Sequence, residues 1–165
     1  MNIEQFVKKI IKEEVVWYLS KDEGSACCPS IQSESLLVYP FWHRKREAVE
    51  CAIQEWSGYT AKKIRLTEFL EVWCIPLFEN DILLGIGFDK KMQGTEVHPL
   101  ILLDQLIQEI QLQKKEPRIK LKLYDDLDQI KEEIRQYLSW EYISVEYQQS
   151  KTFKIIASFE KNWIT

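Results

Sequence analysis

Hydrophobic positions recur with helical spacing at the start of the chain and then alternate as they do in strands. The positions with helical spacing are Ile3, Phe6, Val7, Ile10 and Ile11. They predict an amphipathic helix over 3–14. The β-branched and aromatic run at 15–19 predicts a strand, a weaker strand is expected at 26–28, and a third at 36–39 is expected to stop at Pro40. Together these strands predict an antiparallel meander.

The middle of the chain predicts two helices with a short strand between them. Residues 43–56 have the pattern of a helix that Gly58 ends. Its expected apolar face consists of Val49, Ala52, Ile53 and Trp56. Residues 63–66 alternate as a strand, and the hydroxyl of Thr67 is expected to cap the helix that follows. Pro76 is expected to end or kink that helix, because proline lacks the N–H that a helix interior requires.

Two glycines interrupt the next apolar run, 82–88, which predicts a strand. Gly85 and Gly87 weaken a strand, so they indicate a bulge or a close approach of the backbone. The pair also resembles part of a dinucleotide-binding loop, but Lys90 stands where the third glycine of such a loop would fall. A helix over 99–113 is predicted to begin with a proline, which suits the first helical turn.

The end of the chain predicts a β-α-β-β unit. Residues 119–123 alternate as a half-buried strand, Asp125 and Asp126 suit the N-terminus of a helix, and 143–147 and 153–159 alternate as a hairpin. The apolar stripe expected on that helix is Leu127, Ile130, Ile134, Tyr137 and Leu138. The nearby acidic residues are expected to cap the helix and to form its solvated face. They are Asp125, Asp126, Asp128, Glu132 and Glu133.

The charged, proline-containing stretch 114–117 is the predicted boundary between two parts. Residues 1–115 are expected to form an α+β core domain, and 116–165 the appended β-α-β-β unit. The predicted fold class is α+β, with a mostly antiparallel sheet that carries helices. A chain of 165 residues with 45% hydrophobic residues is long enough to bury such a core.

Charge and cysteines narrow the classes of function. The net charge of −4 and the short basic runs at 43–46, 62–65 and 114–115 argue against nucleic-acid binding, which needs several cations on one face. No segment has the pattern of a signal peptide or a membrane span, so a cytoplasmic protein is expected. The four cysteines lack metal-ligand spacing, which indicates free thiols in a reducing compartment, with no cofactor and no metal.

An ordered set of motifs along residues 1–113 resembles a bacterial family. In order, the motifs are Val16 and Trp17, the run Tyr39 to Trp42, Gly58 and Tyr59, Ile64 to Leu70, Trp73, Pro76 and Leu77, Asp81, Leu83 to Phe88, and Gly94 to Pro99. This order is similar to that of the domain of unknown function numbered 2750. His43 stands where that family commonly has Ser, and the strand ending at Phe88 departs from its usual Val-Asn-Trp. The resemblance implies a fold and a bacterial origin, and no activity.

Cys28 and His43 are the pair that would serve as nucleophile and base in a catalytic site. That chemistry needs an electropositive neighbour that lowers the pKa of the thiol, and a third group that orients the imidazole. The sequence indicates neither, so a buried structural cysteine is the alternative. Glu79, Asp81 and Asp89 would offer oxygen ligands to a cation, but they lack the spacing of a calcium loop and are expected to be solvated.

The aromatic run Tyr39 to Trp42 is the strongest candidate for a binding surface. Adjacent residues cannot easily both point inward, so one ring is expected in the core while the other lines a groove near two arginines. Aromatic and arginine side chains are enriched at interface hot spots. The candidate binding residues are therefore Tyr39, Phe41, Trp42, Arg44, Arg46 and Trp73. The alternative is that both rings belong to the core.

Two functions fit these patterns. The first is a non-enzymatic protein-binding domain, and a toxin-neutralising immunity-type protein would be an example of it. The second is a small cysteine-dependent hydrolase or transferase that uses Cys28 and His43. The first is favoured because the sequence contains no complete catalytic or metal-binding motif.

Overall fold

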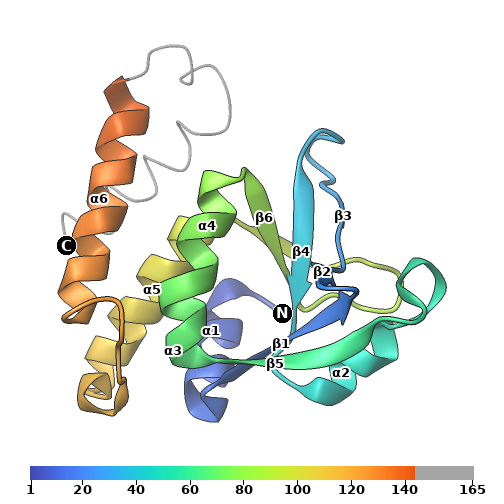
Figure 1. Ribbon diagram of the computed structural model, residues 1–165, viewed down its shortest axis with the longest axis horizontal. Coiled ribbons are helices and arrows are strands. Elements are labelled where there is room, and N and C mark those ends of the chain that lie inside the picture. Colours follow the sequence, from blue (N-terminus) through green and yellow to red (C-terminus); the bar gives the residue numbers. More distant parts are fainter. Residues whose placement is uncertain (144–165) are drawn as a thin grey trace. The chain divides into compact units, whose positions relative to one another are not determined.

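The computed structural model describes residues 1–143, and Figure 1 shows the arrangement of its helices and strands. The chain divides into two compact units, Met1–Lys120 and Leu121–Thr165. Helices packed on antiparallel and mixed sheets confirm the predicted α+β class. The assignment of 1–115 and 116–165 to separate domains stays a prediction.

The first sheet is antiparallel and has β1 (Val15–Lys21) at its centre. On one side β1 pairs with the short β2 (Gly24–Ser25), and on the other with β5 (Thr60–Arg65). The pairing with β5 runs along six residues, from Val15 opposite Arg65 to Ser20 opposite Thr60. The predicted strands at 15–19 and 63–66 are therefore present, and both are longer than expected.

The second sheet has the order β3 (Cys28–Pro29), β4 (Leu37–Phe41), β6 (Ile82–Ile86) and β7 (Thr95–Val97). β4 and β6 are parallel, and the other pairs are antiparallel. The predicted meander is wrong, because β1 and β4 belong to different sheets. Pro40 does not stop β4 either. β3 pairs with β4 only at Leu37 and Val38, so proline's missing N–H breaks no ladder on that side.

Trp17 of β1 and Trp42, just after β4, join the two sheets. The Trp17 N–H donates to the carbonyl of Trp42 at 2.8 Å, and the Trp42 N–H donates to the carbonyl of Trp17 at 2.9 Å. This isolated antiparallel bridge places the outgoing end of β4 directly beside the middle of β1. The two sheets therefore meet at a pair of tryptophans.

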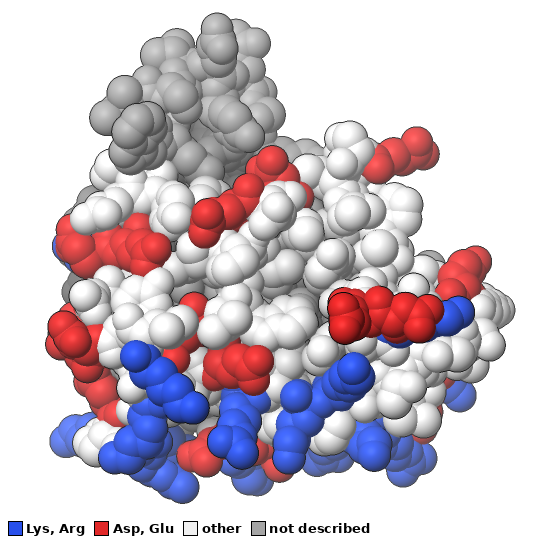
Figure 2. Space-filling view, viewed as in Figure 1, with Lys and Arg blue, Asp and Glu red and all other residues white. Residues whose placement is uncertain are grey.

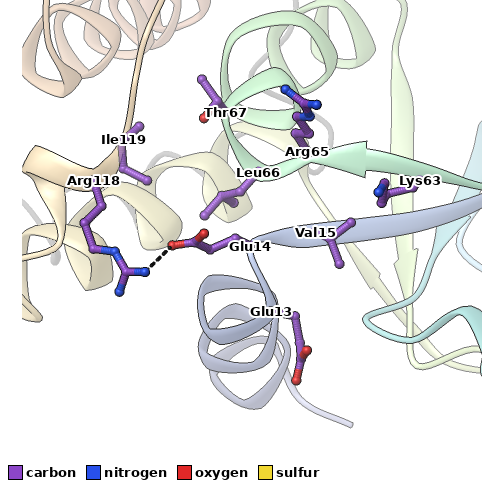
Figure 3. A pocket seen from close by; sticks show the side chains of 9 residues that line it. All are labelled: Glu13, Glu14, Val15, Lys63, Arg65, Leu66, Thr67, Arg118 and Ile119. Atoms are coloured by element: carbon purple, nitrogen blue, oxygen red, sulfur yellow. Dashed lines mark ion pairs between the residues drawn. The ribbon is translucent and has the colours of Figure 1, made fainter.

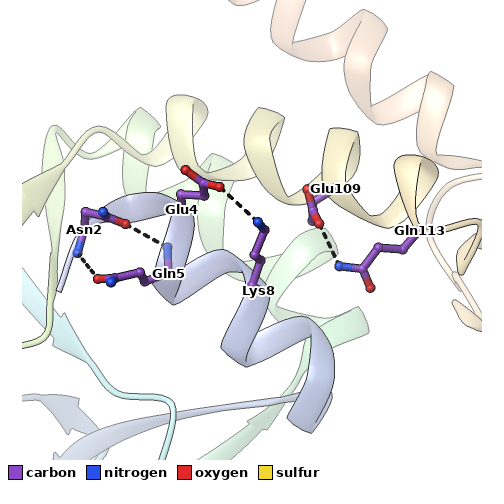
Figure 4. A network of polar contacts seen from close by, with 6 residues as sticks. All are labelled: Asn2, Glu4, Gln5, Lys8, Glu109 and Gln113. Atoms are coloured by element: carbon purple, nitrogen blue, oxygen red, sulfur yellow. Dashed lines mark hydrogen bonds and ion pairs between the residues drawn. The ribbon is translucent and has the colours of Figure 1, made fainter.

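Helices α1 (Ile3–Glu13) and α5 (Pro99–Leu112) confirm two sequence predictions and pack against each other. α1 begins with a capping box (Figure 4). The Asn2 side chain accepts the backbone N–H of Gln5, and the Gln5 side chain accepts the backbone N–H of Asn2. α5 has its proline in the first turn, and its end is predicted to within one residue. α5 is apolar over most of its surface, which is typical of a buried helix, and most of its leucines and isoleucines are buried in the core.

A continuous helix follows β5 and contains three parts: α3 (Leu66–Glu68), a wider π-helical segment (Phe69–Trp73) and α4 (Cys74–Glu79). The predicted cap at Thr67 is wrong, because the helix already begins at Leu66 and has no side-chain cap. Pro76 does not end this helix but lies within α4. The π turn before it changes the hydrogen-bond spacing where a regular α-helix would meet the proline ring.

Helix α2 (Lys45–Cys51) is shorter than the predicted 43–56. The chain leaves the helical region at Ala52 and then forms a separate turn, Gln54–Trp56. Of the predicted apolar face, Trp56 is buried, whereas the prediction is wrong for Val49 and Ile53. Ala48 and Cys51 are buried instead, and Val49 and Ile53 are 51% and 41% exposed. The break allows Trp56 to pack against Trp42, with ring centroids 6.3 Å apart.

The second unit contains α6 (Leu127–Ile143), which confirms the predicted helix and the cap at Asp126, whose carboxylate accepts the Gln129 N–H at 2.8 Å. The strand predicted at 119–123 is wrong. No strand of the described chain pairs with this segment, and Leu123 is 67% exposed. The predicted hairpin strands at 143–147 and 153–159 lie outside the described residues, apart from Ile143 at the end of α6.

Candidate functional site

The two adjacent rings of the aromatic run, Phe41 and Trp42, are both buried. Phe41 is 0% exposed and Trp42 is 1% exposed. Phe41 packs edge-on against Phe69, at 5.3 Å between ring centroids, on one side of the sheet. Trp42 packs on the other side, in a core cluster that α2 helps to form. Both rings are buried because helices cover both sides, which agrees with the alternative that both belong to the core.

The other proposed binding residues are spread over different surroundings. Trp73 is half-buried against Phe41, 5.8 Å away between ring centroids, and Tyr39 is also half-buried. Burial raises the pKa of the Tyr39 hydroxyl. Arg44 and Arg46 are exposed at the start of α2, and Arg46 pairs with Glu50 at 3.0 Å. The structure therefore groups the aromatics inside and leaves the arginines outside, and their role in binding stays a prediction.

The Cys28 thiol has surroundings opposite to those of a nucleophile. Burial, together with the negative charge of Glu96, raises its pKa to about 11. The imidazole of His43 is buried just before α2, with Nε2 3.2 Å from a carboxylate oxygen of Glu47. Burial lowers its pKa, and Glu47 partly opposes this shift. Near neutral pH the thiol is thus protonated, and a protonated thiol is a poor nucleophile.

The carboxylates singled out in the sequence act locally. Asp89 accepts the backbone N–H groups of Lys91 and Gln93 at 2.8 and 3.2 Å, which stabilises the turn after β6. Glu79 and Asp81 are exposed. Within residues 1–143, no group of three or more His, Cys, Asp or Glu side chains has the arrangement of a metal site.

No helix in this part of the chain has the length and apolarity needed to cross a membrane.

Gly85 of β6 and Gly87, which follows the strand directly, confirm the expected close approach of the backbone. A Cβ on Gly85 would lie 2.5 Å from the Phe88 ring and 2.9 Å from Val38. Gly87 has a positive φ of 63° and lies against Met1. These glycines let Phe88 fold back over the strand, where its carbonyl accepts the Trp42 indole N–H at 3.0 Å.

Two basic runs that are short in the sequence lie side by side in the structure. Lys45 of α2 lies over the Trp17 ring, with Nζ 5.8 Å from its centroid. Trp17 is paired across the sheet with Lys63 of β5, and Arg65 follows on the same side of that strand. We call the exposed side chains of Lys45, Lys63 and Arg65, with the half-buried Trp17, the basic face. Figure 2 shows Lys and Arg gathered along the lower edge, where β5 and α2 lie in Figure 1.

Lys63 and Arg65 are exposed and have no ion pair within the described part of the chain. This distinguishes them from Arg46 and Arg118, which pair with Glu50 and Glu14. Cations beside an indole ring, with no carboxylate of their own, offer charge and a flat apolar surface to an anionic group.

A cleft of about 490 Å³ lies at the end of β5 (Figure 3). Its cationic side chains are Lys63, Arg65 and Arg118, and its acidic ones are Glu13 and Glu14. Arg118 reaches across to Glu14, with 3.4 Å between their charged atoms. The basic face thus continues from Trp17 into a cleft that retains a net excess of positive charge.

A second hollow, of about 570 Å³, borders the buried Trp42. Glu47, Glu50 and Asp89 lie around it together with Lys90 and Lys91. Because opposite charges are mixed there, the hollow has no single preference for an anion or a cation. It is therefore a weaker candidate for a charged partner than the basic face.

The sequence contained a signal for the basic face that its analysis missed. Lys63 and Arg65 are two residues apart in a predicted strand, so they had to share one side of it. The proximity of Lys45 was not readable, because it depends on α2 packing onto β1 and β5. Trp17 and Arg118 were missed because their positions depend on the pairing of β1 with β5 and on the ion pair between Arg118 and Glu14.

The sequence comparisons place the chain in a family. A protein-family model described as "protein of unknown function (DUF2750)" matches residues 3–106. The chain belongs to this family. The match extends from the start of α1 into α5, so it includes both sheets and the basic face, whereas α6 lies outside it. No curated protein and no solved structure matches the chain.

Proposed function

We propose that this DUF2750 domain is a non-enzymatic protein-binding domain whose basic face takes an acidic partner. The observation that supports this best is the convergence of Lys45, Lys63 and Arg65 around Trp17. A protein with a net charge of −4 holds these cations together on one surface, and two of them lack a carboxylate partner in the described chain. Charge complementarity of this kind steers a partner to one face and fixes its orientation.

A protein partner fits this surface better than a nucleic acid. A duplex backbone needs a continuous series of cations to neutralise successive phosphates. Here carboxylates interrupt the positive charge: Glu13 and Glu14 line the cleft, and Glu47 and Glu50 lie on α2. An acidic protein segment has spaced charges and apolar side chains between them, which match spaced cations beside an indole ring.

Protein binding is also favoured over cysteine-dependent catalysis. A nucleophilic thiol needs a lowered pKa, whereas burial raises the pKa of Cys28 to about 11. The charges that act on Cys28 are negative, and the groups that act on His43 belong to α1, to α2 and to its N-cap residue, Arg44. The two side chains therefore lack the mutual support that a nucleophile and its base require.

Affinity for an acidic peptide tests the proposal. The probe is a short fluorescein-labelled peptide in which glutamate alternates with valine, and fluorescence anisotropy measures its dissociation constant. The double variant Lys63→Glu with Arg65→Glu is expected to weaken binding about tenfold or more, because it replaces attraction with repulsion. The matched control, Lys90→Glu with Lys114→Glu, makes the same change of charge at exposed sites away from the basic face.

The two double variants separate a local effect from a global one. Equal weakening in both would mean that net charge alone drives binding, and this would contradict the proposal. A single-stranded oligonucleotide of the same net charge that binds more tightly than the peptide would also contradict it. Weaker peptide binding at high salt is expected, because exposed charges are screened.

A further inference from the structure

The β5 strand has one edge that pairs with β1 and a second edge that pairs with nothing in the described chain. The order of the first sheet is β2-β1-β5, so β5 is its outermost strand. From the geometry of this edge we infer that the partner binds as an extended acidic strand, added to the sheet along β5. This inference rests on the proposed function and specifies the form that the partner takes.

The register shows which backbone groups point outward. The backbone N–H and carbonyl of Trp17 both form hydrogen bonds with Trp42, so both point away from β5. In an antiparallel pair, a residue directs both groups to the same side, and the residue opposite it in a non-hydrogen-bonded pair directs its own groups the other way. Lys63 lies opposite Trp17, so its N–H and carbonyl point to the open edge.

The neighbouring pair supports the same assignment. The carbonyl of Leu19 accepts the N–H of Ala26, on the β2 side of β1, and Leu19 lies opposite Ala61. The backbone of Ala61 therefore also points to the open edge, in step with Lys63. Within residues 1–143, neither residue forms another backbone hydrogen bond on that side. Together they form the ladder that an added strand needs.

Charge selects the occupant of this edge. Lys63 and Arg65 project on one side of the sheet and Lys62 on the other, and all three are exposed. A second copy of the chain on this edge would bring these cations against their own equivalents, and lysines on an edge strand oppose such self-pairing. An acidic strand meets the same cations with favourable charge, and its end reaches the cleft that Arg118 borders.

Two variants of Lys63 separate the backbone contact from the charge. Lys63→Ala removes the ammonium group and keeps the outward N–H. Lys63→Pro removes both, and it leaves the β1 ladder intact because that N–H takes no part in it. The glutamate-valine peptide is expected to bind Lys63→Pro about fivefold more weakly than Lys63→Ala. Circular dichroism and thermal unfolding establish that both variants are folded.

A peptide modified at its backbone provides the complementary test on the unmodified protein. Methylation of alternate backbone nitrogens of the peptide leaves its charges in place and removes the donors that a ladder needs. The methylated peptide is expected to bind about tenfold more weakly. With the unmethylated peptide, hydrogen exchange of the Ala61 and Lys63 amides is expected to slow, whereas the Lys62 amide, already bonded to β1, is expected to change little.

The outcomes distinguish the two proposals. If both peptides bind equally and charge reversal on the basic face still weakens binding, strand addition is wrong while the proposed function stands. If neither peptide binds the folded domain, the proposed function and the strand addition are both wrong. Equal affinity of Lys63→Pro and Lys63→Ala would likewise overturn strand addition.

Discussion

The aromatic run Tyr39 to Trp42 and the basic run Lys62 to Arg65 differ in exposure in the opposite sense to that which their sequences suggest. The aromatic run has the composition of an interface, yet Phe41 and Trp42 are fully buried on opposite sides of a sheet. The basic run is too short to indicate a binding surface in the sequence, yet it lies on the outermost strand of its sheet in the described chain, beside a second basic segment. Residue type indicates what a side chain is able to do, and the packing of its neighbours decides whether a partner can reach it.

The largest expected difference between the two regions is in stability. Trp42→Ala is expected to lower the free energy of unfolding by about 3–5 kcal/mol, because it leaves a cavity between the sheets and removes the bond to the Phe88 carbonyl. Trp42→Phe, which keeps an aromatic ring, should cost less. Urea unfolding measures both variants. A loss below about 1 kcal/mol for Trp42→Ala would contradict the interior assignment.

The two adjacent cysteines allow the same comparison by reactivity. Cys27 is exposed, whereas Cys28 is buried and has its pKa raised to about 11. At pH 7.5 such a thiol is roughly 0.03% thiolate, so it should react with iodoacetamide far more slowly than Cys27. Mass spectrometry of the labelled native protein identifies the site. Rapid labelling that survives Cys27→Ser and disappears in Cys28→Ser would instead support a reactive thiol at position 28.

A smaller effect is expected from a single methyl group at the interior. Gly85→Ala should destabilise the protein by about 1–3 kcal/mol, because the added Cβ would collide with Phe88 and Val38. Gly24→Ala is the matched control, since its nearest atom, the Lys21 carbonyl oxygen, is 3.4 Å away. Thermal unfolding compares the two, and equal shifts would refute the close packing over β6.

The smallest stability effect is expected on the basic face. Lys63→Ala and Arg65→Ala should each change the free energy of unfolding by no more than about 0.5 kcal/mol, because both side chains are exposed and unpaired within the described chain. Urea unfolding checks this. A large loss of stability would show that these cations have a structural role. Weaker binding by their variants would then reflect loss of the folded state and not loss of a contact with the partner.

Local patterns predicted the elements whose signals are contained within a few turns. The capped, amphipathic α1 and the proline-initiated α5 follow from spacing alone. The failures occur where distant segments decide. α2 stops early where Trp56 packs onto Trp42, and Pro40 remains inside β4 because β3 is too short to reach it. The strand predicted at 119–123 lacks a partner strand in the described chain.

The candidate site was less predictable than the fold for the same physical reason. A strand period places Lys63 and Arg65 on one side, but the position of Lys45 depends on how α2 packs. The open edge of β5 depends on the order of the sheet, which no local pattern contains. The burial of both Phe41 and Trp42 could be predicted only if it was known that helices cover both sides of the sheet.

The most direct measurement is a residue-by-residue map of amide chemical shifts as the glutamate-valine peptide is added to isotope-labelled protein. The expected changes are concentrated along Thr60 to Arg65 and around Lys45 and the Trp17 indole, and they saturate with peptide concentration. Changes concentrated around the hollow at Trp42 and Lys90, or saturable binding without changes along β5, would contradict the assignment of the basic face as the binding surface.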